Sequence, residues 1–155
     1  MPQLNSKILK ATVTLILLTF APGNLFAETI RIESKHSVSD SIERMTNAIK
    51  KAGARVFLVV NYQDGVASVG HTIRPTSVII FGNPKIGGAV FQVSQTFGLY
   101  LPLRVLAYED GQGKVWMIYH DPADAATEHG VTKDHPAIKA MQGVLAKLTN
   151  LAASK

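Results

Sequence analysis

The residues with the most pointed chemistry lie in one glycine-rich segment, Gly82–Gly88, which follows a run of apolar residues. A turn from a strand into a helix presents free backbone N–H groups, and these bind anions together with a nearby positive charge. We expect four residues of this segment to bind a small anionic ligand: Asn83, Lys85, Gly87 and Gly88. The alternative is turn chemistry alone, in which Pro84 begins a helix. The lysine does not stand at the spacing of a nucleotide-binding P-loop.

A second group of polar residues follows a hairpin strand, in the order Tyr119-His120-Asp121-Pro122. A carboxylate and an imidazole are the pair that general acid/base catalysis uses most, which makes Asp121 and His129 the candidate pair. Tyr119 and Glu109 are further candidates, and Lys85 or Tyr119 would give electrophilic help. The alternative is that Asp121 caps a helix that begins at Pro122. No serine-nucleophile motif is present, and whether the protein is an enzyme stays open, with a binding role favoured.

Metal and thiol chemistry have little support in the sequence. The chain holds no cysteine, which excludes disulfides, thiolate nucleophiles and cysteine-ligated metals. The five histidines are His36, His71, His120, His129 and His135. None are paired at the i, i+4 spacing of a helical metal site, and only His129 and His135 bracket a loop that would let them meet. We expect no metal site and no cofactor.

The first 27 residues are typical of a secretory signal peptide. Lys7 and Lys10 precede the apolar run ATVTLILLTF, and the segment ends at Ala27. That order of charge, apolar run and small residue predicts cleavage after Ala27 and a periplasmic or secreted protein. The apolar run is shorter than the roughly 20 residues of a spanning helix, so no membrane attachment is expected after cleavage. The alternative is a retained anchor or a core helix.

Removal of this segment changes the charge of the chain. The full sequence has 16 basic and 11 acidic residues and a net charge of +5, and the loss of two lysines leaves 14 basic residues and +3. The remaining bases are scattered, with no basic stripe for nucleic acid. The expected partner is therefore a small anionic ligand or another protein. The 128 residues from 28 to 155 suffice for one domain with its own core.

Hydrophobic periodicity predicts an α+β domain with one sheet of about five strands. Alternating or continuous apolar runs place the strands at Thr29–Ser34, Arg55–Asn61, Ser77–Phe81, Leu101–Glu109 and Lys114–Tyr119. Helices are expected from Ser37 to about Ala52, from Lys85 to about Gln95, from Asp121 to Gly130, and from His135 onward. The order begins β-α-β, continues with a strand, a short helix and a hairpin, and ends with two helices packed against the sheet.

The pattern of apolar residues also predicts which side chains are buried. Val38, Ile42, Met45 and Ile49 form one apolar helix stripe, and the run Arg55–Asn61 is typical of a buried strand. The segment Tyr62–Thr76 predicts a loop with room for one short helix. On the strand Leu101–Glu109, one face carries Arg104, Leu106 and Tyr108. That mixed face suits packing against a partner chain, including a second copy.

Together these motifs resemble the domain-of-unknown-function family 302 of small bacterial and archaeal proteins. The resemblance is carried by Phe81-Gly82-Asn83-Pro84-Lys85-x-Gly87, Leu101-Pro102-Leu103, Tyr108-Glu109-Asp110, Gly113-Lys114-Val115-Trp116, Tyr119-x-Asp121-Pro122 and His129-Gly130. It covers residues 30–150 and implies a single compact α+β domain with no established activity. This chain has Gly88 where many members have Thr, and Tyr62 where many have His. The resemblance also suggests that six residues face one pocket: Asn83, Lys85, Glu109, Tyr119, Asp121 and His129.

Three functions remain open at this stage. The first is an exported, non-enzymatic ligand-binding or accessory module with an anion site at Gly82–Gly88. The second is a general acid/base enzyme that uses Asp121 and His129. The third is a structural or oligomerisation domain. The geometry of these residues in the folded chain separates the three.

Overall fold

The computed structural model describes residues 29–155, and the predicted signal peptide, residues 1–27, lies outside them. The strands are β1 (Thr29–Ser34), β2 (Arg55–Asn61), β3 (Thr76–Gly82), β4 (Leu103–Glu109) and β5 (Val115–His120). The helices are α1 (Val38–Lys51), α2 (Tyr62–Ala67), α3 (Pro84–Phe91), α4 (Pro122–Glu128) and α5 (Pro136–Ala153), with a 3₁₀ helix at Gln95–Leu99. The expected α+β class is confirmed.

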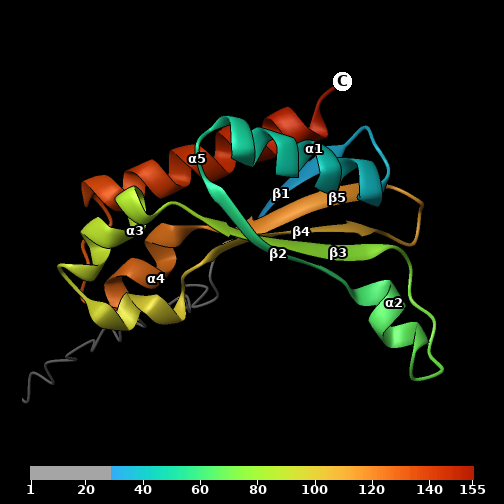
Figure 1. The fold of residues 1–155 in the computed structure, drawn as a ribbon, viewed down its shortest axis with the longest axis horizontal. Helices are drawn as coiled ribbons and strands as arrows, with labels where there is room; N and C mark the ends of the chain where they lie inside the picture. Colours follow the sequence, from blue (N-terminus) through green and yellow to red (C-terminus); the bar gives the residue numbers. More distant parts are fainter. Residues whose placement is uncertain (1–28) are drawn as a thin grey trace, which may run out of the picture.

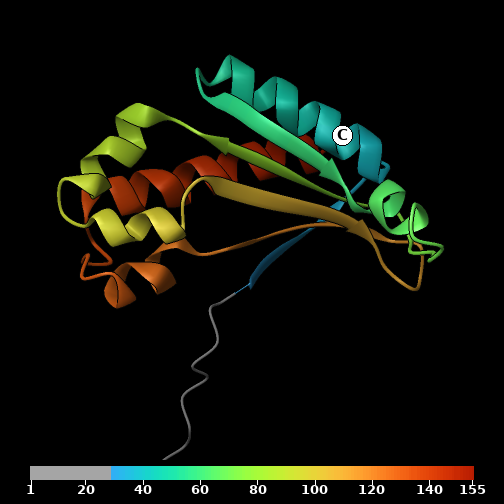
Figure 2. The same ribbon diagram turned by 60° about the horizontal axis from the view of Figure 1, so that its bottom comes forward.

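All five strands join one antiparallel sheet in the order β1-β5-β4-β3-β2. The first two strands of the chain therefore lie at opposite edges, and α1 runs across the sheet between them. Helices α1 and α5 pack side by side on one face (Figure 1, Figure 2). Helices α3 and α4 gather at the sheet end where β3 finishes and β4 begins. None of the helices within residues 29–155 is both long and apolar enough to cross a membrane.

The main core lies between the sheet and the pair α1 and α5. The predicted α1 stripe is confirmed, because Val38, Ile42, Met45 and Ile49 are all buried. On α5 the buried positions follow the 3.6-residue period through Met141, Leu145, Leu148 and Ala152. Leu151, the residue before Ala152, is 51% exposed. Ala152 takes the inward position in the last turn, which rotates Leu151 to the surface.

Four of the helices begin at a residue whose side chain caps the helix. Ser37 caps α1 by accepting a hydrogen bond from the N–H of Asp40 at 3.1 Å. In α3, α4 and α5 a polar cap, Asn83, Asp121 or His135, directly precedes a proline. Proline at the first helical position loses no hydrogen bond and has a suitable φ. Gly53 ends the α1 segment with φ near +70°, a conformation that favours glycine.

Three details of the fold differ from expectation. Strand β2 was predicted to be buried and is an edge strand in which Phe57, Leu58 and Val59 are 41–53% exposed. An apolar run alone does not reveal whether a strand has neighbours on both sides. Strand β4 begins at Leu103 instead of two residues earlier, because a proline precedes it and proline cannot donate to a sheet. Helix α3 ends at Phe91 and a separate 3₁₀ turn follows.

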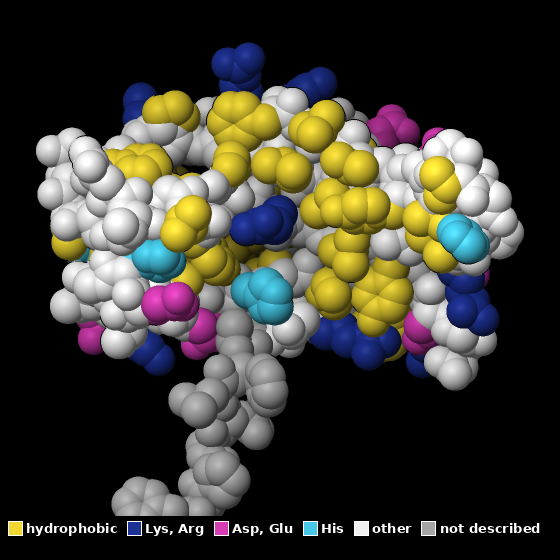
Figure 3. Space-filling view, turned by 90° about the horizontal axis from the view of Figure 1, so that it is seen from below, with side chains coloured by type: hydrophobic (Ala, Val, Ile, Leu, Met, Phe, Trp, Pro, Cys, Tyr) yellow, Lys and Arg dark blue, Asp and Glu magenta, His cyan; other side chains and the backbone are white. Residues whose placement is uncertain are grey.

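The sheet face opposite α1 and α5 is only partly covered. Register pairs Arg104 with Ile80 and Leu106 with Val78, and directly opposed residues share a face. The shared face predicted for Arg104, Leu106 and Tyr108 follows from that register. Figure 3 shows apolar side chains gathered on this open face, beside basic and histidine side chains.

Candidate functional site

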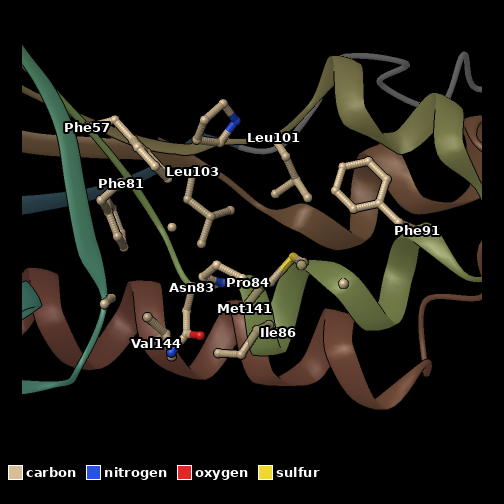
Figure 4. A pocket seen from close by; sticks show the side chains of 15 residues that line it. Phe57, Phe81, Asn83, Pro84, Ile86, Phe91, Leu101, Leu103, Met141 and Val144 are labelled. Atoms are coloured by element: carbon tan, nitrogen blue, oxygen red, sulfur yellow. The ribbon is translucent and has the colours of Figure 1, made fainter.

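An apolar cavity of about 350 Å³ lies where α3, α5 and the start of β2 meet (Figure 4). Fifteen residues line it: Ala54, Phe57, Phe81, Gly82, Asn83, Pro84, Ile86, Gly87, Gly88, Phe91, Leu101, Pro102, Leu103, Met141 and Val144. Asn83 supplies the single polar side chain in this set, and none of the fifteen is charged. A cavity of this composition favours an apolar occupant.

Gly87 and Gly88 of α3 line one wall of the cavity without filling it with side chains. A Cβ added at Gly88 would meet nothing within 4 Å, and one at Gly87 would lie 3.5 Å from Cδ1 of Leu101. Gly88 therefore has open space beside it, whereas a side chain at Gly87 would contact Leu101. Met141 and Val144 of α5 form the opposite wall. The glycine pair creates volume in this cavity and is not needed for the turn that precedes α3.

Two partly exposed aromatic rings stand at the rim. Phe57 of β2 is 48% exposed and Phe91 at the end of α3 is 41% exposed. A Cβ at Gly82 would lie 3.1 Å from the ring of Phe57, and one at Gly98 would lie 3.0 Å from Cε1 of Phe91. Each ring is thus seated against a glycine. The rim is apolar and accessible, while the floor, which includes Phe81, is buried.

The residues predicted to bind an anion are divided by the fold. Asn83, Gly87 and Gly88 line the cavity, whereas Lys85 is exposed and outside it. The N–H of Lys85 donates to Oδ1 of Asn83 at 3.0 Å. The N–H groups of Ile86 and Gly87 donate to the carbonyl of Asn83 at 3.0 and 2.9 Å. The first amides of α3 therefore have partners within the chain.

The predicted acid/base pair is not brought together. Asp121 caps the start of α4 and His129 caps its end. Eight residues of helical rise separate them by about 12 Å. Nδ1 of His129 lies 3.2 Å from Oγ1 of Thr96, and its ring meets the ring of Phe97 edge-on at 5.7 Å. Asp121 instead contacts α5, through Gln142 at 2.8 Å.

The remaining candidate catalytic residues, Tyr119 and Glu109, also lie apart from each other and from the cavity. Tyr119 is buried under the helices, and burial, followed by the charge of Asp121, raises its pKa. Glu109 ends β4 opposite Val115, at the far end of the sheet from Asn83. The six residues suggested to share one pocket therefore do not: Asn83 alone lines the cavity.

Tyr100 links the 3₁₀ helix to the end of β5. Its hydroxyl donates to the carbonyl of His120 at 2.8 Å. Burial is the main reason that the pKa of Tyr100 rises to about 12, and the charge of Asp121 adds to it. This tyrosine supports the corner beside the cavity through that hydrogen bond, and the raised pKa keeps its hydroxyl protonated near neutral pH.

Histidines and carboxylates do not converge within residues 29–155: no group of three His, Cys, Asp or Glu is placed to hold a metal ion. His135 caps α5, where its Nδ1 accepts from the N–H of Ala137 at 3.2 Å. Nε2 of His36 lies 2.7 Å from the carbonyl of Ser154.

Sequence reasoning missed the cavity because its lining comes from five separate segments. The sequence predicts a strand that begins at Leu101, and an apolar residue such as Phe91 ordinarily belongs to the core. One signal was available: residues 86–103 contain no charged side chain. Such a stretch, outside the predicted strands for much of its length, marks a surface that is apolar for a reason other than the main core.

Fold and site together define a small α+β domain with an apolar cavity, in which the predicted acid/base pair lies at opposite ends of α4. The chain belongs to the family described as "Domain of unknown function DUF302", which matches residues 30–153. The solved structure of an uncharacterized conserved protein DUF302 from Bacillus stearothermophilus is similar, with a TM-score of 0.65 and 17% sequence identity. That match covers 81% of this chain and 94% of the other, and it shows the shared fold.

Curated relatives carry a different name. The chain is 44% identical over 126 residues to the fluoride-specific ion channel FluC 1 of Brucella suis biovar 1 (strain 1330). The match covers 80% of this chain and 49% of that protein. The fluoride-specific ion channel FluC 1 of Brucella abortus biovar 1 (strain 9-941) matches with the same identity over 46% of its length. The chain spans about half the length of the curated relatives it matches.

Proposed function

We propose that this protein is a non-enzymatic binding module that holds a small apolar molecule in the cavity between α3 and α5. The observation that carries the proposal is the lining: fourteen of the fifteen residues around about 350 Å³ are apolar or glycine. A dry cavity of 150 Å³ holds benzene, so this volume suits a ligand of about 14 non-hydrogen atoms. An aromatic or short aliphatic compound fits that description.

The position of Asn83 adds a limited polar requirement. Its Oδ1 is engaged by the N–H of Lys85, and its side chain lies among the cavity residues in Figure 4. The side-chain NH₂ of an asparagine donates two hydrogen bonds. We therefore infer that the preferred ligand carries one acceptor group, such as a hydroxyl or carbonyl oxygen, at one end of an apolar body. No reaction forms part of this proposal.

The direct test is a titration with 1-aminoanthracene, a neutral aromatic fluorophore whose emission rises in apolar surroundings. We expect saturable binding to the mature chain at one site per molecule. Sodium phosphate and sodium fluoride, added separately, should leave that binding unchanged. Displacement of the probe by either salt would favour an anion site and overturn the apolar proposal.

The two helical glycines Gly88 and Gly143 provide a matched pair of variants. Both have open space at the Cβ position, but Gly88 lines the cavity and Gly143 is an exposed residue on α5 outside it. Replacement of a helical glycine by leucine improves helix propensity at either position. Gly88→Leu should fill the cavity and reduce probe affinity at least tenfold, whereas Gly143→Leu should leave it unchanged. Equal affinities in the two variants would rule the cavity out.

A second candidate function rests on the curated relatives. They are named fluoride-specific ion channels, and this chain matches about half of each. We propose that the shared half is an accessory domain of those proteins and that this chain has the same accessory role. Fluoride transport measured in vesicles that contain a fluoride channel, with and without this protein, tests the idea. Identical transport rates with and without this protein would contradict the accessory role and would not affect the proposal of an apolar ligand.

A further inference from the structure

The two edges of the sheet differ in their protection against pairing with another strand. On β1 the exposed side chains are polar or charged, and they include Arg31 and Glu33. On β2 three successive exposed residues are apolar: Phe57, Leu58 and Val59. Edge strands usually avoid association through charges, prolines or short length. Strand β2 pairs with β3 alone in the described chain. Its register with β3 shifts between Val56 and Leu58, as at a bulge, but residues 56–60 contribute no charge and no proline to the outer edge.

The two ends of β2 carry opposite charges. Arg55 is exposed at the first position, where its guanidinium lies 5.7 Å from the ring centre of Phe57. Asn61 is the last residue, and its Nδ2 donates to Oδ2 of the exposed Asp64 at 2.7 Å. Residues 56–60 hold no charge. The strand is therefore positive at one end, apolar in the middle and negative at the other.

We propose that β2 pairs with β2 of a second copy, antiparallel about a two-fold axis at Leu58, so that the two sheets form one continuous sheet. Arg55 of each copy then lies opposite Asn61 of the other, beside the carboxylate of Asp64. Six residues of strand rise keep the two Arg55 side chains about 20 Å apart. A parallel arrangement would place the two Arg55 side chains next to each other. The repulsion between them therefore favours the antiparallel arrangement.

The same pairing covers the exposed apolar residues. Phe57 of one copy faces Val59 of the other, and the two Leu58 side chains meet at the axis. Aromatic and β-branched side chains on opposed strands stabilise each other. Because an isologous contact uses the same surface on both copies, it closes at two. The charged β1 edges remain outside, which favours a dimer over a longer array.

The register makes a charge-swap test possible, with sedimentation velocity of the mature chain at several concentrations as the measurement. The unmodified chain should be a dimer. Arg55→Asp and Asp64→Lys should each weaken the dimer at least tenfold, because each places like charges together twice. The combined variant, Arg55→Asp with Asp64→Lys, should regain most of the affinity. Failure of the combined variant to regain it, while its circular dichroism is unchanged, would overturn the register.

A matched pair of apolar-to-charged variants tests the surface itself. Leu58 and Leu151 are 53% and 51% exposed, and Leu151 lies on α5. Leu58→Lys should yield monomers, and Leu151→Lys should remain dimeric. A monomeric unmodified chain, assembly beyond a dimer, or equal behaviour of the two variants would each overturn the proposal. The inference does not depend on the cavity ligand, because Gly88→Leu leaves β2 intact and should remain dimeric.

Discussion

Both carboxylate oxygens of Asp121 accept hydrogen bonds from the side-chain amide of Gln142, at 2.8 and 3.0 Å. Oδ1 also accepts from the N–H of Ala123 at 2.8 Å, the capping bond of α4. One carboxylate thus fixes the start of α4 and ties it to the middle of α5. These hydrogen bonds give Asp121 a structural role at the start of α4, at the opposite end of that helix from His129.

We predict that Asp121→Ala lowers the free energy of unfolding by about 1–3 kcal/mol, because a cap and a charged hydrogen bond are lost together. Urea denaturation of the two proteins measures this difference in the free energy of unfolding. Asp134→Ala is the control, since that side chain is 90% exposed and contacts only Lys139 among the ion pairs; the change there should stay within about 0.5 kcal/mol. In a double-mutant cycle with Gln142→Ala, strictly additive losses would contradict the contact.

Stability should fall at alkaline pH through Tyr100. The pKa of Tyr100 is raised to about 12 by burial and by the charge of Asp121, above its value of about 10 in the unfolded chain. The folded protein therefore holds this proton more tightly, and the stabilisation is lost as pH rises from 10 toward 12. Urea midpoints at pH 9 to 12 should fall more steeply for the unmodified chain than for Tyr100→Phe. Parallel curves would contradict the assignment.

An acid-side effect should arise from Asp110 in the hairpin. Its Oδ2 accepts from Nε1 of Trp116 at 2.7 Å, and its Oδ1 accepts from the N–H groups of Gln112 and Lys114. The Trp116 hydrogen bond is the main cause of the lowered pKa of Asp110. Because the folded-state pKa lies below the unfolded one, this stabilisation is present above about pH 4 and is lost as pH falls through the folded value.

The comparison for Asp110 is with Asp110→Asn, which cannot ionise. Between pH 5 and pH 2, the urea midpoint should fall less in this variant than in the unmodified chain. Trp116 fluorescence reports the same hairpin directly, and its emission should shift at neutral pH in the variant. An identical acid profile in both proteins would show that another carboxylate is responsible.

Export can be tested from the amino terminus of the mature protein. Cleavage after Ala27 would leave Glu28 as the first residue. We predict that protein recovered from the periplasmic fraction has the mass of residues 28–155 and begins at Glu28. Protein of full-length mass in the cytoplasm would contradict the predicted signal peptide.

The parts of the fold that were predictable are those governed by local periodicity. The α1 stripe from Val38 to Ile49 and the caps at Ser37 and Asp121 depend on neighbours within a few residues, so the sequence pattern contains them. The edge position of β2 depends on which strands lie beside it, and no local pattern contains that. Leu58 is exposed because β2 lies at the edge of the sheet, which only the order of the strands determines.

The site was less predictable than the fold for the same reason. Asn83, Gly87 and Gly88 were identified because they form a recognisable turn, and they do line the cavity. The chemistry assigned to them was anion binding, yet the N–H groups of that turn are occupied by the carbonyl and side chain of Asn83. Phe57 and Met141 complete the cavity from remote segments, and their partnership exists only in the folded chain.

The position of β1 beside β5 has a consequence for the order in which the chain folds. Thr29 pairs with His120, and Arg44 of α1 donates to the carbonyl of Ala152 at 3.0 Å, across 108 positions of sequence. The elements that are synthesised first, β1 and α1, thus form their contacts with elements that are synthesised last. Contacts so distant in sequence slow folding. The contacts between α1 and α5 form only after the final helix has been made. For a protein predicted to be exported, such a delay would be an advantage, because translocation would then precede folding.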